Sequence, residues 1–387
     1  MTLLAQPLER LLALGDLGRA PAGAVVGVHT PARRSVAAGG WAVLPTQESD
    51  GVPMTRDTWL DWASVTKVAA TTLLLLLLSD AGELDLDQPV ARQVPGFAGG
   101  GRERVTVTHL LTHTSGLAAW EPLYCRATDV AAATAAVVGL PLVSAPGEVR
   151  RYSDLGLVLA GHVVERVTGL DLPTAFRRHV AAPLGLSLRL GPVPAVWAAT
   201  SADSDVVEQV MVARGEPYPV EASPEDFAGW RGTPVRGDTH DGNAAHAFGG
   251  AAGHAGLFGQ AADLLALGAA LCDGTLLAPA TLEAAAHPTP ADPTQGLGLR
   301  LLERPGPHGA PVTWLWHGGF TGTVWALEPR SGTVVAGGAT RLHGTTGPLR
   351  TRPSASRGPG PLAGLATGEQ IRDVVLAAAH PPKETSR

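Results

Sequence analysis

The 387-residue chain contains only two cysteines, and it shows neither a signal-peptide pattern nor an apolar run of membrane-spanning length. Cys125 and Cys272 are too few for a disulfide framework, and they form no CxxC metal or redox motif. The apolar stretch Val68–Leu78 has 11 residues, whereas a spanning helix needs about 20, so it predicts a buried core helix. Met1–Leu14 lacks a basic region and a sustained apolar region, and its pattern predicts an amphipathic helix. We therefore expect a soluble cytoplasmic protein without a membrane span, provided that no signal peptide has been removed before Met1.

Lysine is almost absent, although basic residues as a class are not. The chain has 29 basic and 35 acidic residues, and only Lys67 and Lys383 among the basic ones are lysine. The net charge of −6 and the lack of a basic stripe exclude the electrostatic footprint of a nucleic-acid-binding protein. Arginine stays protonated in proteins, whereas the pKa of a lysine can be shifted by its surroundings. Lys67 is therefore a candidate for proton chemistry, whereas Lys383 is interpreted as an ordinary residue of the C-terminal tail.

Strand-like segments occur near both ends of the chain, and helical patterns occupy the middle. The strand patterns are rich in β-branched or small residues and are bounded by Gly and Pro: 23–30, 35–42, 312–317, 322–327 and 333–340. The helical patterns each end near a glycine or at the chain end: 64–81, 106–114, 155–168, 260–272 and 368–380. This order predicts one antiparallel sheet assembled from the two ends of the chain, with a helical lobe inserted between them. The segment 344–364, rich in Gly, Pro, Ser and Arg, is predicted to be a flexible loop.

Ser64-Val65-Thr66-Lys67 opens the most apolar of the predicted helices. Residues three apart share a helical face, so Lys67 can reach the hydroxyl of Ser64. The helix start also places positive partial charge and free N–H groups beside Ser64, which favours a developing oxyanion. A serine needs such activation to act as a nucleophile. Alone, a Ser-x-x-Lys pattern is common enough to arise by chance.

Two further segments contain candidate chemistry, although each also has an ordinary structural interpretation. Tyr152-Ser153-Asp154 precedes the predicted helix 155–168, and a phenol beside an ammonium can be tuned toward proton transfer. Ser153 or Asp154 could equally be a simple helix N-cap. His317-Gly318-Gly319 ends a predicted strand, where glycines let a substrate lie along the strand edge. By itself this third segment is no more than a turn.

Taken together and in this order, the three segments resemble the motifs of the serine β-lactamase and penicillin-binding-protein superfamily. The chain is most similar to the class C-like branch, which also contains D-alanyl-D-alanine carboxypeptidases and family VIII carboxylesterases. Further segments that match the pattern are 62–90, 105–117, 146–169, 249–264 and 316–323.

The resemblance implies an α+β fold and a set of roles for individual residues. The fold would be an antiparallel sheet flanked by N- and C-terminal helices, formed by 1–80 and 290–387, beside a mainly helical lobe, 81–289, with the active site in the cleft between them. Ser64 would be the nucleophile, Lys67 would share its proton, and Tyr152 would be general base and then proton donor to the leaving group. The backbone N–H groups of Ser64 and Phe320 would form the oxyanion hole.

The sequence departs from the β-lactamase pattern at two of the three motifs. His317-Gly318-Gly319 stands where these enzymes usually have Lys-Thr-Gly, and neutral histidine and glycine bind a substrate carboxylate less well. Asp154 replaces asparagine, and its carboxylate would hold Lys67 charged, which leaves more of the proton transfer to Tyr152. Arg341 could restore a carboxylate contact or could be a solvated arginine at a strand end. These differences favour an esterase or an unusual peptidase over an efficient β-lactamase.

Other candidate residues are weaker. His109 and His113 have the spacing of a metal-binding pair, but no third ligand is evident, so we predict structural histidines and no metal. His240, Asp241 and His254 lie in Gly-rich segments that could line the cleft. Three tryptophans lie near the third motif: Trp314, Trp316 and Trp325. They are interpreted as core residues, although alternation along a strand could direct one of them toward the substrate.

We therefore predict a serine hydrolase that acts on a small ester or amide through an acyl-enzyme on Ser64, with no metal or organic cofactor. Asp154, His317, Gly318, Gly319 and Arg341 are the predicted substrate-binding residues. A D-alanyl-D-alanine carboxypeptidase or weak β-lactamase acting on a peptide or β-lactam is the alternative enzyme. A penicillin-binding scaffold or sensor with little turnover is the alternative from another class.

Overall fold

The computed structural model describes residues 3–127, 129–306, 309–347 and 360–379. Lys383 and much of the predicted loop 344–364 lie outside these residues. The helices are α1 (Ala5–Leu12), α2 (Leu73–Asp80), α3 (Val107–Leu111), α4 (Val130–Gly139), α5 (Asp154–Thr168), α6 (Leu172–Phe176), α7 (Val206–Arg214), α8 (Ala261–Cys272), α9 (Pro279–Ala285) and α10 (Gly368–Ala377).

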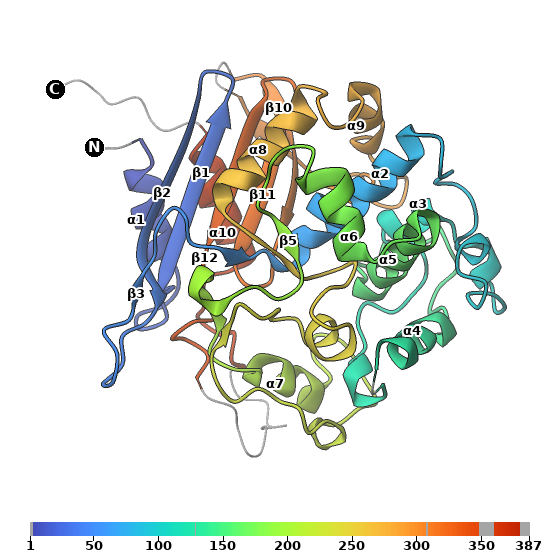
Figure 1. Ribbon diagram of the computed structural model, residues 1–387, viewed down its shortest axis with the longest axis horizontal. Helices are drawn as coiled ribbons and strands as arrows, with labels where there is room; N and C mark the ends of the chain where they lie inside the picture. The colour runs from blue at the N-terminus through green and yellow to red at the C-terminus, as the bar shows by residue number, and fades with distance from the viewer. Residues whose placement is uncertain (1–2, 128, 307–308, 348–359, 380–387) are drawn as a thin grey trace.

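A seven-stranded antiparallel sheet is assembled from the two ends of the chain, as the sequence predicts (Figure 1). Its spatial order is β3-β2-β1-β12-β11-β10-β9, so the first long strand lies directly beside the last. The strands are β1 (Gly23–Thr30), β2 (Arg33–Val43), β3 (Val52–Pro53), β9 (Arg300–Pro305), β10 (Pro311–Gly318), β11 (Thr323–Glu328) and β12 (Thr333–Ala339). The short strands β4 (Leu60–Asp61), β8 (Leu257–Gly259) and β5 (Arg189–Leu190) form a second sheet, and β6 (Thr200–Ala202) pairs with β7 (Val235–Arg236).

Helices cover both faces of the large sheet because its central strands are apolar on both sides. Alternate residues of a strand point to opposite faces, and in β12 Val334 joins one core cluster while Val335 joins another. Helices α1 and α10 pack against the face of Val335, and α8 packs against the face of Val334. The helices α3 to α6 form the other side of the molecule (Figure 1).

The position of α8 corrects one predicted boundary. The predicted helical lobe, 81–289, includes this helix, but α8 packs on strands β1 and β12 of the large sheet. Gly268 permits the close approach, since a Cβ atom there would lie 2.5 Å from the side chain of Val334. The rest of the division into two lobes stays a prediction.

The predicted helix 64–81 is regular only in its second half. A 3₁₀ turn (Ala63–Val65) and π-helical turns (Lys67–Thr72) precede α2. Among the described residues, the segment Ala63–Asp80 is the one helix long and apolar enough to cross a membrane, and 78% of it is buried inside the protein. It packs against α5, as expected for the central helix of a core.

Gly253, in the segment just before β8, allows this segment to lie in close contact with α5. A Cβ atom at this position would lie 1.9 Å from the carbonyl oxygen of Leu157 and 2.9 Å from the backbone nitrogen of Gly161. The carbonyl of Gly253 accepts a hydrogen bond from Thr71 Oγ1 at 2.7 Å. The segment around Gly253 is therefore packed against α5 and hydrogen-bonded to the helix that begins at the Ser-x-x-Lys motif.

We expect Gly253→Ala to lower the free energy of unfolding by at least about 2 kcal/mol, because the new methyl group meets backbone atoms that cannot rotate away. Urea denaturation followed by circular dichroism measures this change. Gly139→Ala is the matched control, since a Cβ atom at Gly139 has no neighbour within 4 Å; we expect a change below about 1 kcal/mol. Equal stability of the two variants would contradict the close contact.

Candidate active site

Ser64 lies in a strained turn between β4 and the central helix. Ala63 has a φ of 46°, a left-handed conformation that residues with a side chain rarely adopt. The buried carboxylate of Asp61 accepts the backbone N–H of Ala63 at 2.8 Å and that of His240 at 2.8 Å. Burial raises the pKa of Asp61 to about 6, although these two backbone hydrogen bonds lower it. Asp61 thus fixes the turn that presents Ser64.

Lys67 is 1% exposed, and its ammonium group has three acceptors. Nζ donates to Ser64 Oγ at 2.7 Å and to the carbonyl of His254 at 3.1 Å. It also lies 2.7 Å from Asp154 Oδ1 in an ion pair. The structure therefore brings the first motif and the second motif together around one buried cation.

The charge of Lys67 is stabilised by its neighbours. Burial lowers the pKa of Lys67, but the carboxylate of Asp154, followed by the hydroxyl of Tyr152, raises it, and the pKa stays above that of a free lysine. A lysine in this state donates hydrogen bonds and does not accept a proton. The expectation that Asp154 holds Lys67 charged agrees with this geometry.

Tyr152 lies beside Lys67 and Ser64 at the start of α5. Burial raises the pKa of Tyr152, while the charge of Lys67 and side-chain hydrogen bonds to Lys67 and Ser64 lower it in part. Its ring contacts His113, with centroids 4.7 Å apart, and His317, with centroids 6.0 Å apart. The hydroxyl of Tyr152 is thus protonated at neutral pH and lies next to the hydroxyl of Ser64.

The sequence left open whether Ser153 or Asp154 is the helix N-cap, and the structure assigns the cap to Ser153 and a contact with Lys67 to Asp154. Ser153 is the N-cap of α5, since its Oγ accepts the N–H of Gly156 at 3.1 Å and donates to the carbonyl of Ala118 at 2.7 Å. Asp154, the first residue of the helix, is 15% exposed and faces Lys67. Capping therefore orients the carboxylate toward the site.

The third motif lies against the turn that contains Ser64. Thr321 Oγ1 donates to the carbonyl of Asp61 at 2.8 Å, and Thr323 Oγ1 donates to the carbonyl of Trp62 at 3.0 Å. A Cβ atom at Gly319 would lie 2.5 Å from the carbonyl oxygen of Trp62 and 3.2 Å from the Cβ of Ala63. Only glycine fits at this position.

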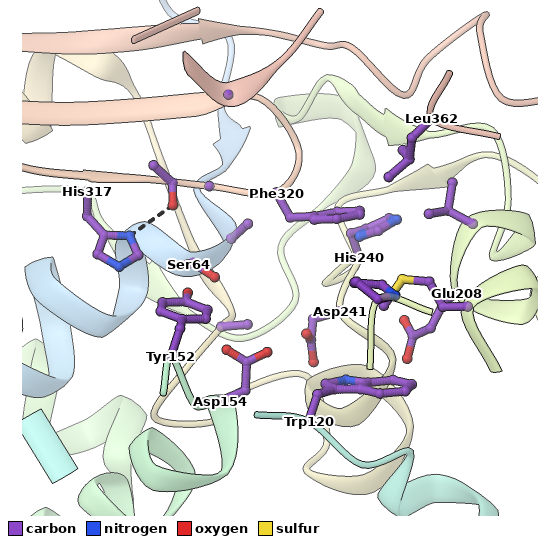
Figure 2. A pocket seen from close by; sticks show the side chains of 18 of the residues that line it. Ser64, Trp120, Tyr152, Asp154, Glu208, His240, Asp241, His317, Phe320 and Leu362 are labelled. Atoms are coloured by element: carbon purple, nitrogen blue, oxygen red, sulfur yellow. Dashed lines mark hydrogen bonds between the residues drawn. The ribbon is translucent and has the colours of Figure 1, made fainter. Parts of the chain in front are cut away.

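His317 is buried and turned toward its own strand end. Its Nδ1 donates to the carbonyl of Gly318 at 2.9 Å (Figure 2). Burial and the charge of Lys67 lower the pKa of His317 to about 3. The imidazole is therefore neutral at physiological pH, as the sequence analysis assumed.

Phe320 and Arg341 form a stack at the edge of the pocket. The ring of Phe320 lies between the imidazole of His240, with centroids 5.8 Å apart, and the guanidinium of Arg341, 5.1 Å from the ring centroid. Arg341 donates to the carbonyls of Phe320 at 2.9 Å and Ala366 at 3.0 Å. Arg341 thus orients the peptide of Phe320, and its predicted contact with a substrate carboxylate stays a prediction.

A pocket of about 530 Å³ opens at Ser64 (Figure 2). Every predicted site residue except the buried Lys67 lines it: Ser64, Tyr152, Asp154, His317, Gly318, Gly319, Phe320 and Arg341. Sequence reasoning missed several other residues of the wall: Trp120, Arg150, Glu208, Met211, Tyr218, Arg300 and Leu362. No motif marks them, because the fold alone brings them to the pocket.

The other histidines, tryptophans and cysteines considered in the sequence have structural contacts or lie in the pocket wall or the interior. His109 Nδ1 accepts the N–H of Thr106 in a capping box, and His113 Nδ1 accepts the N–H of Ser153, so both histidines have structural contacts. Within the described parts of the chain, no three metal-binding side chains cluster. The other candidates are distributed between pocket and interior: His240, Asp241 and Trp316 line the pocket, His254, Trp314 and Trp325 are buried, and Cys125 and Cys272 are free.

The chain is similar to known proteins in sequence and in fold. A family model described as beta-lactamase matches residues 10–356. A protein of Escherichia coli (strain K12) named "Putative D-alanyl-D-alanine carboxypeptidase" is 29% identical over 310 residues, which cover 72% of this chain and 68% of that protein. D-amino acid amidase from Ochrobactrum anthropi has a similar fold, with a TM-score of 0.68 and 22% identity over 96% of this chain and 97% of the amidase. EstCE1, described as a hydrolase with promiscuous acyltransferase activity, has a TM-score of 0.65 and 25% identity over 96% of this chain and 98% of its own.

The scarcity of lysine allows the charge of Lys67 to be measured directly. In a Lys383→Arg background with isotope-labelled lysine, one side-chain NMR signal remains, and we expect it to titrate above about pH 10.4, the value of a free lysine. Asp154→Asn should lower the pKa of Lys67 by at least about one unit, because the paired carboxylate is removed. A Lys67 signal that titrates below the free value in the unsubstituted site would contradict the ion pair.

Proposed function

This chain belongs to the beta-lactamase family, and within that family we propose that it is a serine hydrolase of small esters and amides. One observation carries the proposal: Ser64 Oγ lies 2.7 Å from Lys67 Nζ, which is itself 2.7 Å from Asp154. A serine hydroxyl held by a buried ammonium at the bottom of a pocket is an activated nucleophile.

Acylation begins when Ser64 Oγ attacks the carbonyl carbon of the substrate. Lys67 donates to Ser64 Oγ and stabilises the negative charge that develops there. The Ser64 proton passes to the hydroxyl of Tyr152, which in the same step gives its own proton to the leaving oxygen or nitrogen. This relay does not require a phenolate, in keeping with the raised pKa of Tyr152.

Charge on the substrate oxygen is stabilised by the backbone N–H groups of Ser64 and Phe320. The contacts of Thr321 and Thr323 with the Ser64 turn hold the two peptides in a fixed relation, and preorganised donors of this kind supply much of an enzyme's rate enhancement. Deacylation then follows the reverse path: water attacks the acyl carbon and gives a proton to the hydroxyl of Tyr152, which in the same step gives its own proton to Ser64 Oγ as the bond between the acyl group and Ser64 breaks. All these steps use side chains and backbone of the chain, without a cofactor.

The third motif supports an ester or amide substrate over a β-lactam. The neutral His317 offers no charge to the carboxylate that β-lactams carry, and Gly318 offers no hydroxyl. EstCE1 is described as a hydrolase with acyltransferase activity, which agrees with esterase-type chemistry in this fold.

D-alanyl-D-alanine carboxypeptidase activity is the second candidate function. Arg150 and Arg300 line the pocket, and their charges act on His317, so a terminal carboxylate could bind on that side. Both arginines already contact Asp292, at 3.4 Å and 3.0 Å. This engagement leaves the carboxypeptidase as the weaker of the two proposals.

The nucleophile is tested with the unsubstituted protein and Ser64→Ala, each incubated with p-nitrophenyl butyrate, nitrocefin and a fluorescent penicillin. We expect turnover of the ester, at most slow turnover of nitrocefin, and a loss of at least about a thousandfold in ester turnover on substitution, since no other hydroxyl replaces Ser64 Oγ. Stable penicillin labelling without turnover would instead support a penicillin-binding scaffold. Identical behaviour of the two proteins would show that Ser64 is not the nucleophile.

A further inference from the structure

We propose that the acyl part of the substrate carries a protonated amino group, which binds at the carboxylates of Glu208 and Asp241. This inference rests on the proposed function, because it assigns the substrate of the same Ser64 site. Asp154, Asp241 and Glu208 follow one another along one wall of the pocket (Figure 2). Asp154 is paired with Lys67 and Asp241 Oδ1 with His254, which leaves Glu208 as the carboxyl group of this wall without an ion-pair partner among the described residues.

Glu208 lines the pocket and has one buried carboxyl oxygen without a hydrogen bond of standard geometry. The residue is 8% exposed, and its Oε2 accepts the N–H of Gly242 at 3.0 Å. Its Oε1 is buried and makes no hydrogen bond of standard geometry among the described residues, although the hydroxyl of Tyr124 lies close enough to interact with it. Burying a carboxyl oxygen without a partner is costly. An ammonium group would supply both the missing N–H donor and the opposite charge.

Asp241 adds a second negative charge beside Glu208. Its Oδ1 accepts the N–H of Ala244 at 2.9 Å and lies 2.8 Å from His254 Nε2. Burial, and then the charge of Asp241, raises the pKa of Glu208 to about 8. A bound cation between the two groups would relieve this repulsion and favour the ionised form of Glu208.

The relative positions of Tyr152 and Glu208 identify which part of the substrate faces the carboxylates. Tyr152 protonates the leaving group in the proposed mechanism, so that group lies on the side of Tyr152 and His317. Ser64 lies between these residues and the wall that ends at Glu208 (Figure 2). The group that faces Glu208 therefore stays attached to Ser64 as the acyl group.

The rest of the pocket agrees with this orientation. Arg150 and Arg300 act on His317, at the opposite side, where they would repel an ammonium group. Trp120 and Leu362 line the pocket on the side away from Tyr152 and His317 (Figure 2). Met211 lines the pocket too, and these three side chains offer apolar surface to a substrate side chain. An aminoacyl group, with its amine at the carboxylates and its side chain on the apolar residues, matches this distribution.

The test compares p-nitroanilides of D- and L-alanine with their N-acetyl derivatives at pH 7, where the free amines are mostly protonated. We expect the unsubstituted protein to hydrolyse at least one free amine with a kcat/KM at least about tenfold above that of its N-acetyl derivative. Glu208→Gln should abolish most of this preference through a raised KM for the free amine, and it should change the kcat/KM of the N-acetyl substrates much less. Glu225→Gln, at an exposed position outside the pocket wall, makes the same substitution away from the site and should preserve the preference.

The preference of the unsubstituted protein tests the inference even if Glu208→Gln does not fold. Equal or better hydrolysis of the N-acetyl substrates, no turnover of either free amine, or an equal effect of a folded Glu208→Gln on both substrate types would overturn it. If p-nitrophenyl butyrate is still hydrolysed in a Ser64-dependent manner, only the amine inference fails. If Ser64→Ala leaves that ester activity unchanged, the proposed function itself fails.

Discussion

The buried ammonium of Lys67 is the constraint on which the rest of the site depends. A cation that is 1% exposed is stable only if its N–H groups find acceptors, and here the acceptors come from three parts of the chain. Ser64 is one turn away on the same helix, Asp154 opens α5, and His254 follows the glycine that lies against α5. Substitution of any of these acceptor residues would therefore disturb both the proposed nucleophile, Ser64, and the packing of the central helices.

The large sheet contributes the other half of the site because its strands come from both ends of the chain. Strand β10 ends at His317 and Gly318, and the turn after it is joined to the Ser64 turn through Thr321 and Thr323. Gly319 lets the two backbones approach, and Arg341 holds the peptide of Phe320. The backbone N–H groups of Ser64 and Phe320, the proposed oxyanion donors, are thus fixed by contacts between segments more than 250 residues apart in sequence.

The local pattern of apolar and polar residues is sufficient to predict the helices and strands that have a strong periodicity. It does not predict which distant residues the tertiary fold brings together in the pocket. The predicted strand 23–30 matches β1 at both ends, and the helix 155–168 matches α5 to within one residue. Strand β9 was missed, since its polar, partly exposed sequence lies at the edge of the sheet. Lys67 and Tyr152 could be identified because lysine and tyrosine are rare in this chain and because the three motifs occur in a fixed order. No local pattern marks Glu208, because its significance depends on a buried oxygen that only the folded pocket wall reveals. The strain at Ala63 and its support by Asp61 were equally invisible in the sequence.

The account as a whole depends on a covalent intermediate at Ser64. Rapid acid quench of the protein during turnover of p-nitrophenyl butyrate, followed by digestion and mass spectrometry of the peptides, tests this intermediate directly. We expect the mass of one butyryl group on the peptide that contains Ser64, and its disappearance after the substrate is exhausted. Ester turnover with no acylated peptide, or with the butyryl group on a residue other than Ser64, would contradict the account.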